Sequence, residues 1–134
     1  MSCRILISDT QVASRRMLRF AMDMKKCEVL ECADLDETMA MLAAHRVDLL
    51  LVSLYPWDSE GYSVLEQIHE RFKQNPLPVL LIGDTVLRAG FDVYRWRGTA
   101  WLDRPFRVSE LMNLVDSILS FPAGHPGPGK VLAG

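Results

Sequence analysis

The chain has 134 residues, 49% of them hydrophobic and 24% charged, which fits one globular domain with a sizeable core. Its net charge of -2 gives no general attraction for nucleic acid, and no apolar stretch is long enough to cross a bilayer. The N-terminus enters a strand pattern directly, without a signal-peptide layout. The cysteines Cys3, Cys27 and Cys32 lack metal-ligand spacing, so free thiols in a reducing cytoplasm are expected.

Apolar segments and turn residues alternate along the chain and predict five strands and five helices. The expected strands are 4–8, 28–33, 48–53, 78–82 and 99–102. The expected helices are 12–24, 34–43, 59–72, 85–96 and 109–121. Asp34, with Glu37 three residues later, predicts a capping box at the start of the second helix. Residues 122–134 are rich in Pro and Gly and predict a disordered tail or linker, which leaves 3–121 as the domain.

The alternation of strands and helices predicts an α/β fold, a doubly wound parallel sheet with helices on both faces. The unbroken apolar run 49–52 is typical of a central strand that is buried on both sides, and this strand ends at Ser53. Ligands of open α/β sheets bind beyond the carboxyl ends of the strands. At that edge the sequence places Asp9 and Thr10, Ser53, Gly83 and Arg104.

Five segments in order carry a family resemblance. They are 4–10 (Arg-Ile-Leu-Ile-Ser-Asp-Thr), 48–54 (Asp-Leu-Leu-Leu-Val-Ser-Leu), 57–61 (Trp-Asp-Ser-Glu-Gly), 78–83 (Pro-Val-Leu-Leu-Ile-Gly) and 101–106 (Trp-Leu-Asp-Arg-Pro-Phe). Over residues 4–121 the chain resembles a response-regulator receiver domain of the CheY type. The resemblance implies a flavodoxin-like receiver fold with strand order 2-1-3-4-5 and a role in two-component phosphorelay signalling.

The same resemblance implies that the phosphorylation site is degenerate. Receivers hold Mg²⁺ with two adjacent acids after the first strand, but here only Asp9 matches and Thr10 stands at the second position. The phosphate-accepting aspartate falls on Ser53. Aspartyl phosphate chemistry needs a carboxylate nucleophile and a metal that neutralises the incoming phosphoryl group. We therefore expect neither a cofactor nor Mg²⁺, with Asp9 the one retained candidate ligand, and no phosphorylation of Ser53 of the kind an aspartate undergoes.

Further positions of the family's pocket also differ. The phosphoryl-binding hydroxyl residue falls on Gly83, and the lysine before the cis-prolyl-type pair falls on Arg104, while Pro105 is kept. We expect Arg104 to pair with Asp9 across the pocket, with Asp84 and Asp103 as rival partners.

An aromatic and basic group marks the expected working face. Trp101 falls where receivers have their aromatic switch, and Tyr94, Arg95 and Trp96 precede it. A tryptophan is too bulky to turn inward easily, so Trp101 is expected to keep one orientation. We therefore expect the face formed by the fourth helix, fifth strand and fifth helix to bind a protein partner or a second copy of the chain. A sensor kinase and an output domain are the candidate partners.

These observations favour a non-enzymatic, phosphorylation-independent protein-interaction module, with neither membrane nor nucleic acid as a partner. One alternative is a receiver that still responds to phosphorylation or to a small anion through a rebuilt pocket. A third interpretation, from a different class, is a serine hydrolase or a nucleotide-binding flavodoxin-like protein. Ser53 lacks the Gly-x-Ser-x-Gly elbow of a hydrolase nucleophile, and no glycine-rich phosphate-binding fingerprint occurs.

Overall fold

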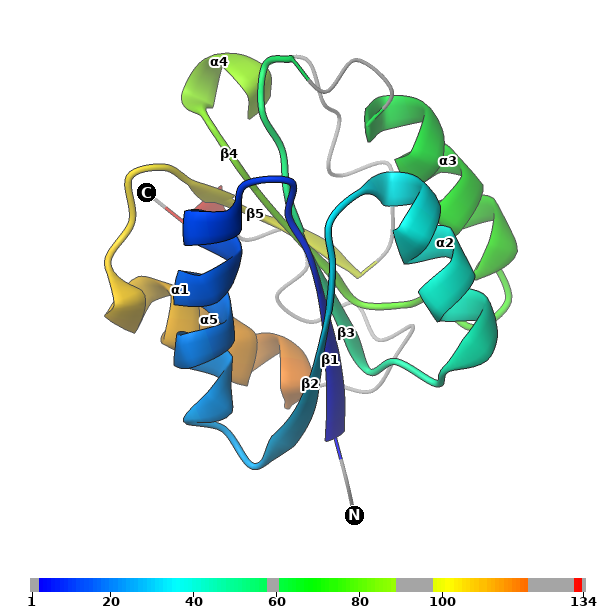
Figure 1. Ribbon diagram of the computed structural model, residues 1–134, viewed down its shortest axis with the longest axis horizontal. Coiled ribbons are helices and arrows are strands. Elements are labelled where there is room, and N and C mark those ends of the chain that lie inside the picture. The colour runs from blue at the N-terminus through cyan, green and yellow to red at the C-terminus, as the bar shows by residue number, and fades with distance from the viewer. Residues whose placement is uncertain (1–2, 58–60, 89–97, 121–131, 134) are drawn as a thin grey trace.

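Strands and helices alternate along the chain in a computed structural model that describes residues 3–57, 61–88, 98–120 and 132–133 (Figure 1). The strands are β1 (Cys3–Ser8), β2 (Cys27–Cys32), β3 (Leu49–Ser53), β4 (Val79–Gly83), β5 (Thr99–Asp103) and β6 (Leu132–Ala133). The helices are α1 (Val12–Asp23), α2 (Leu35–Ala44), α3 (Gly61–Arg71), α4 (Thr85–Arg88) and α5 (Val108–Leu119). Each predicted strand and helix therefore has a counterpart whose ends differ by a few residues, apart from the helix predicted over 85–96, of which the described residues include 85–88.

The strands form one sheet in the order β2-β1-β3-β4-β5-β6, and every pairing between neighbours is parallel. The order of the first five strands confirms the predicted doubly wound arrangement. This order brings three strand ends together, because Ser8 of β1 pairs with Val52 of β3, and Ser53 of β3 pairs with Ile82 of β4. The segments after β1, β3 and β4 therefore leave the sheet side by side.

The helices cover the sheet in two layers, with α1 and α5 on one face and α2 and α3 on the other (Figure 1). Successive residues of a strand point to opposite faces, so Ile5 and Ile7 join the α1–α5 core while Leu6 joins the α2–α3 core. All five residues of β3 are buried. Burial on both faces explains why the apolar run in this strand shows no alternation.

The second helix begins as its sequence predicts. The carboxylate of Asp34 accepts a 2.7 Å hydrogen bond from the backbone N–H of Glu37, and the Glu37 side chain accepts one from the N–H of Ala33 at 3.3 Å. These contacts satisfy backbone donors that the first turn of a helix leaves free. The local sequence signal at this position therefore agrees with the tertiary structure.

Two expectations meet the structure only in part. Of the predicted helix 85–96, Thr85–Arg88 is helical and residues 89–97 lie outside the described residues. The expectation that the whole tail 122–134 lacks structure is wrong for residues 132–133, which form β6 against Trp101 and Leu102. The physical reason is that β5 would otherwise leave its outer row of backbone hydrogen-bonding groups unpaired at the sheet edge.

Candidate functional site

The carboxyl ends of the central strands bring the predicted site residues together. Asp9 follows β1, Ser53 ends β3, Gly83 ends β4, and Arg104 follows β5. Asp9 and Ser53 are buried, whereas Thr10 is exposed. The backbone N–H of Arg104 donates to the carbonyl oxygen of Gly83 at 2.9 Å, which fixes the start of the loop after β5. Asp9, Ser53, Gly83 and Arg104, together with Tyr55 described below, are called the polar pocket.

Asp9 is held rigidly at the centre of the polar pocket. Its Oδ1 accepts a 2.9 Å hydrogen bond from the backbone N–H of Gln11 and a 2.8 Å bond from the hydroxyl of Tyr55. Its own carbonyl oxygen accepts a 2.8 Å bond from Arg15 on α1. One carboxylate oxygen is thereby occupied by protein donors, while the other, Oδ2, is buried without a hydrogen-bond partner among the described residues.

Tyr55 is the functional candidate that the sequence analysis missed. Its hydroxyl reaches Asp9, and its ring stacks on Trp57 with centroids 4.9 Å apart and planes 8° apart. The guanidinium carbon of Arg104 lies 4.2 Å from the centre of the same ring. No local motif marks this tyrosine. The single available signal is its place two residues beyond a buried strand end, where an aromatic ring with a polar tip can lie over the sheet edge.

Burial raises the pKa of Tyr55 above its ordinary value. The hydrogen bond to Asp9 and the negative charge of that carboxylate also raise this pKa, while a hydrogen bond with Ser14 and the charge of Arg104 lower it. A raised pKa keeps the hydroxyl protonated at neutral pH. Tyr55 therefore donates its proton to Asp9 in this contact, as a neutral phenol beside a carboxylate should.

The expectation that Arg104 pairs with Asp9 is wrong. Arg104 donates from Nη1 to the carbonyl oxygen of Leu54 at 2.6 Å and lies 3.6 Å from Oδ1 of Asp84, one of the rival partners. The physical reason is Tyr55, whose hydroxyl donates to Oδ1 of Asp9 while its ring packs against the guanidinium of Arg104. The peptide bond between Arg104 and Pro105 is cis.

Three buried polar atoms of the pocket lack a hydrogen-bond partner among the described residues. They are Oδ2 of Asp9, Oγ of Ser53 and Nη2 of Arg104. Buried polar atoms are nearly always hydrogen-bonded in folded proteins, often to an ordered water molecule. An acceptor, a hydroxyl and a cationic donor at this edge of the sheet are thus left without partners among the described side chains.

The polar pocket fits Mg²⁺ poorly. This ion prefers an octahedral set of hard oxygens that includes carboxylates. Asp9 supplies one buried carboxylate whose Oδ1 already accepts two hydrogen bonds, and the cationic Arg104 lies over Tyr55 beside it. Within residues 3–57, 61–88, 98–120 and 132–133, no group of three or more His, Cys, Asp or Glu side chains could hold a metal ion.

Trp101 on β5 is fully buried and belongs to the α2–α3 core. The expectation that so large a ring does not turn inward is therefore wrong. Gly83 provides the physical reason, because a Cβ atom at that position would lie 2.9 Å from Cζ2 and 3.0 Å from Cη2 of the indole. The indole Nε1 donates a 2.8 Å hydrogen bond to Oδ1 of Asp103, whose Oδ2 pairs with Arg88 of α4 at 3.0 Å.

The other members of the expected interaction face, Tyr94, Arg95 and Trp96, lie outside the described residues. Trp101, being buried, offers no surface of its own to a partner. Its link through Asp103 nevertheless connects the core to Arg88, the last residue of α4.

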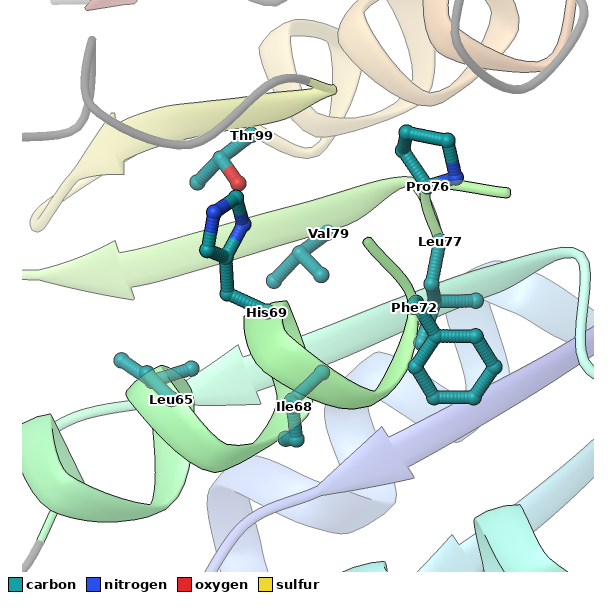
Figure 2. Close-up of a pocket in the computed structure, with 8 residues that line it drawn as sticks. All are labelled: Leu65, Ile68, His69, Phe72, Pro76, Leu77, Val79 and Thr99. Atoms are coloured by element: carbon teal, nitrogen blue, oxygen red, sulfur yellow. The ribbon is translucent and has the colours of Figure 1, made fainter. Parts of the chain in front are cut away.

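A separate apolar pocket lies at the opposite edge of the sheet, where β4 and β5 begin (Figure 2). Its lining residues come from α3, the segment after it, and the first residues of β4 and β5: Leu65, Ile68, His69, Phe72, Pro76, Leu77, Val79 and Thr99. It shares no residue with the polar pocket. Its walls are mostly apolar, so they offer little chemistry besides His69 and Thr99.

Comparison of the sequence with known proteins gives two informative relatives. The response regulator MprA of Mycobacterium bovis is 30% identical over 125 residues, which cover 89% of this chain and 51% of the relative. The probable transcriptional regulator ycf29 of Cyanophora paradoxa is 23% identical over 117 residues, which cover 87% of this chain and 56% of the relative. The chain spans about half the length of these relatives. No protein-family model matches it.

Solved structures show the same fold. The chemotaxis response regulator CheY4 of Vibrio cholerae superposes with a TM-score of 0.75 at 19% identity, covering 88% of this chain and 99% of that one. The receiver domain of the hybrid histidine kinase CckA superposes with a TM-score of 0.64 at 25% identity, covering 87% of this chain and 98% of that one. The chain is a response-regulator receiver domain.

This receiver shares the fold of these solved structures. A serine ends β3, a glycine ends β4, and Tyr55 bridges Asp9 and Arg104. No helix in the described part of the receiver is long and apolar enough to cross a membrane.

Proposed function

We propose that this receiver works in two-component signalling as a protein-interaction module that does not depend on phosphorylation. The observation that carries the proposal is the position of Tyr55. Its hydroxyl occupies Oδ1 of Asp9, and its ring packs under Arg104. A side chain of the protein itself thus engages the two charged groups that would otherwise be available to a metal and a phosphoryl group.

The chemistry of Ser53 supports the same proposal. An alcohol becomes a useful nucleophile at neutral pH when a general base removes its proton. Oγ of Ser53 has no hydrogen-bond partner among the described residues, and Ser53 is 4% exposed. These features also argue against the serine hydrolase interpretation, because a hydrolase needs a base in contact with an accessible hydroxyl.

The partner is proposed to bind the face formed by α4, β5 and α5, where β6 pairs with the outer edge of β5. Trp101 fills the space beside Gly83, and Asp103 links it to Arg88, the last residue of α4. A side chain that packing holds in one position keeps the neighbouring surface in one conformation. No ligand is then needed to shift an equilibrium between two conformations of that surface. A sensor kinase, an output domain or a second copy of the chain would then bind a preformed surface.

A second candidate function is response to a small anion through a rebuilt pocket. The observation in its favour is the set of unpartnered buried atoms, since Ser53 Oγ and Arg104 Nη2 can both donate to an anion. The nearby carboxylate of Asp9 opposes this binding by charge repulsion. We therefore rank this function second.

Treatment with acetyl phosphate and Mg²⁺, followed by intact-mass measurement, tests the first proposal. We expect no gain of a phosphoryl group, because the position that would carry an aspartate carries Ser53. A Mg²⁺-dependent gain that hydroxylamine removes would overturn the proposal. A gain that resists hydroxylamine but is lost in Ser53→Ala would instead favour a phosphoserine and the second candidate.

The proposed face is tested by self-association and partner pull-down with Arg95→Glu. The matched control is Arg16→Glu on α1, an exposed arginine whose helix covers the sheet elsewhere. We expect Arg95→Glu to weaken association and Arg16→Glu to leave it unchanged. The reverse result would move the interaction face to α1.

A further inference from the structure

Cys3 and Cys27 lie side by side at the amino ends of β1 and β2. They are direct partners in the parallel register of these two strands, which Figure 1 shows next to each other with α1 connecting them. Neighbouring strands are roughly 4.8 Å apart. Disulfides need Cα atoms about 4.4–6.8 Å apart, so the register brings this pair within the required range.

The surroundings of the two thiols allow a reaction between them. Both cysteines are partly exposed, and both pack at the margin of the α1–α5 core. The thiol of Cys27 lies near enough to contribute to the raised pKa of Cys3. Each is the first residue of its strand, where the backbone can adjust more easily than in the middle of the sheet.

Cys32 provides a contrast within the same strand. It is 2% exposed, and its Sγ lies 3.5 Å from the carbonyl oxygen of Ile7 and 3.0 Å from Oγ1 of Thr38. An oxidant in solution reaches such a thiol poorly. The receiver therefore has one accessible cysteine pair and one enclosed cysteine.

We propose that Cys3 and Cys27 are a redox site that forms a reversible disulfide with a low-molecular-weight disulfide such as oxidised glutathione as the oxidant. The thiolate of Cys27 attacks one sulfur of glutathione disulfide, whose S–S bond breaks and releases one glutathione thiolate. Cys3 then loses its proton to solvent and attacks the Cys27 sulfur of the mixed disulfide, which releases the second glutathione. Two protein thiols are oxidised, and one glutathione disulfide is reduced to two thiols.

The order of these steps follows from the environment of Cys3. Burial, followed by the hydrogen bond and charge of Cys27, raises the pKa of Cys3 to about 12. Cys3 thus keeps its proton while its neighbour reacts first, because the thiolate is the attacking species. This assignment makes Cys27 the attacking cysteine and Cys3 the resolving one.

The disulfide would close residues 3–27 into a loop that contains α1 and Asp9. Closing such a loop restricts the unfolded chain and stabilises the folded one. The oxidation state of the pair would therefore change the stability of the folded receiver, including the segment that carries Asp9. This inference stands independently of the proposed function, since it uses neither Ser53 nor Tyr55.

The test is incubation of the full chain with oxidised glutathione, followed by intact-mass measurement and a non-reducing peptide map. We expect the loss of two hydrogen atoms, a Cys3–Cys27 linked peptide and an unmodified Cys32. The melting temperature should rise by roughly 5 °C or more and return after treatment with dithiothreitol.

Cys3→Ser and Cys27→Ser are the matched variants. Cys3→Ser should retain a stable glutathionyl group on Cys27, because the resolving thiol is missing, whereas Cys27→Ser should gain little. A disulfide that involves Cys32, covalent dimers in place of the internal link, or no reaction of the wild type would overturn the proposal. A stable double glutathionylation of the wild type would also overturn it.

Discussion

The hydroxyl of Tyr55 donates a 2.8 Å hydrogen bond to Oδ1 of the buried Asp9. This contact joins the loop after β3 to the end of β1, and it places an aromatic ring over the polar pocket. The same ring receives the guanidinium of Arg104 at 4.2 Å. Three strand ends are therefore connected through one side chain that no local pattern singled out.

Tyr55→Phe removes the hydroxyl and keeps the ring. The buried oxygen of Asp9 then loses a donor, which should lower the free energy of unfolding by about 1–3 kcal/mol. Urea unfolding followed by circular dichroism measures this change. Thr10→Val, at an exposed position, is the control and should change stability by less than about 0.5 kcal/mol. Equal stability of Tyr55→Phe and wild type would contradict the importance of this hydrogen bond.

Alkaline pH should destabilise the wild type more than Tyr55→Phe. Burial raises the folded-state pKa of Tyr55 above its ordinary value of 10.0, so the folded chain binds more protons than the unfolded chain above about pH 10. The stabilisation is fully present below that ordinary value and is lost as the pH rises through the folded pKa. Urea midpoints between about pH 8 and pH 11 check this difference. Parallel curves for the two proteins would contradict the pKa shift.

Gly83→Ala should displace Trp101. The new Cβ would lie 2.9 Å from Cζ2 of the indole, a contact that the core can relieve only by moving the ring or the strand. We expect a loss of about 1–3 kcal/mol and a red-shifted tryptophan emission. Trp57→Phe and Trp96→Phe in the background isolate the signal, since the chain has three tryptophans.

The companion variant for this prediction is Gly83→Ala combined with Trp101→Phe. A phenylalanine lacks the two indole carbons that approach Gly83, so the second substitution should recover part of the lost stability. Additive losses in the double variant would show that the two positions are not packed against each other as described.

Arg104→Lys should weaken the polar pocket even though it keeps the charge. The planar guanidinium packs over Tyr55 and donates to the carbonyl of Leu54 at 2.6 Å, and an ammonium group reproduces the flat stacking poorly. We expect a loss of about 1 kcal/mol in urea unfolding, with a smaller loss when Tyr55→Leu has already removed the ring. The same cost in both backgrounds would show that stacking on Tyr55 contributes nothing.

Much of the fold follows from residue patterns that act locally. The apolar runs 49–52 and 79–82 predict buried central strands because a parallel sheet covered on both faces needs no polar alternation. Asp34 and Glu37 determine a helix start through contacts within four residues. The alternation of strands and helices then permits few topologies, since right-handed crossovers are strongly preferred.

The site depended on information that lies far apart in the chain. The sequence placed Asp9, Ser53, Gly83 and Arg104 at one edge, and it favoured an ion pair between the two charged residues by their chemistry. In the tertiary structure Asp9 instead accepts a hydrogen bond from Tyr55, 46 positions away. Arg104 contacts the Tyr55 ring, the carbonyl oxygen of Leu54 and the carboxylate of Asp84. Charge attraction acts between many candidate pairs, so packing decided which pair formed.

The same difference between local sequence pattern and tertiary packing applies to Trp101 and to the two cysteines at the strand starts. The sequence by itself determined that Trp101 lies on a strand and that Cys3 and Cys27 lie near strand starts. The register of β1 with β2 made the two cysteines neighbours, and the space beside Gly83 turned the indole inward. Apolar periodicity determines which residues are buried, because it acts within each element. Register and side-chain volume determine which buried residues touch, because they depend on how separate elements pack.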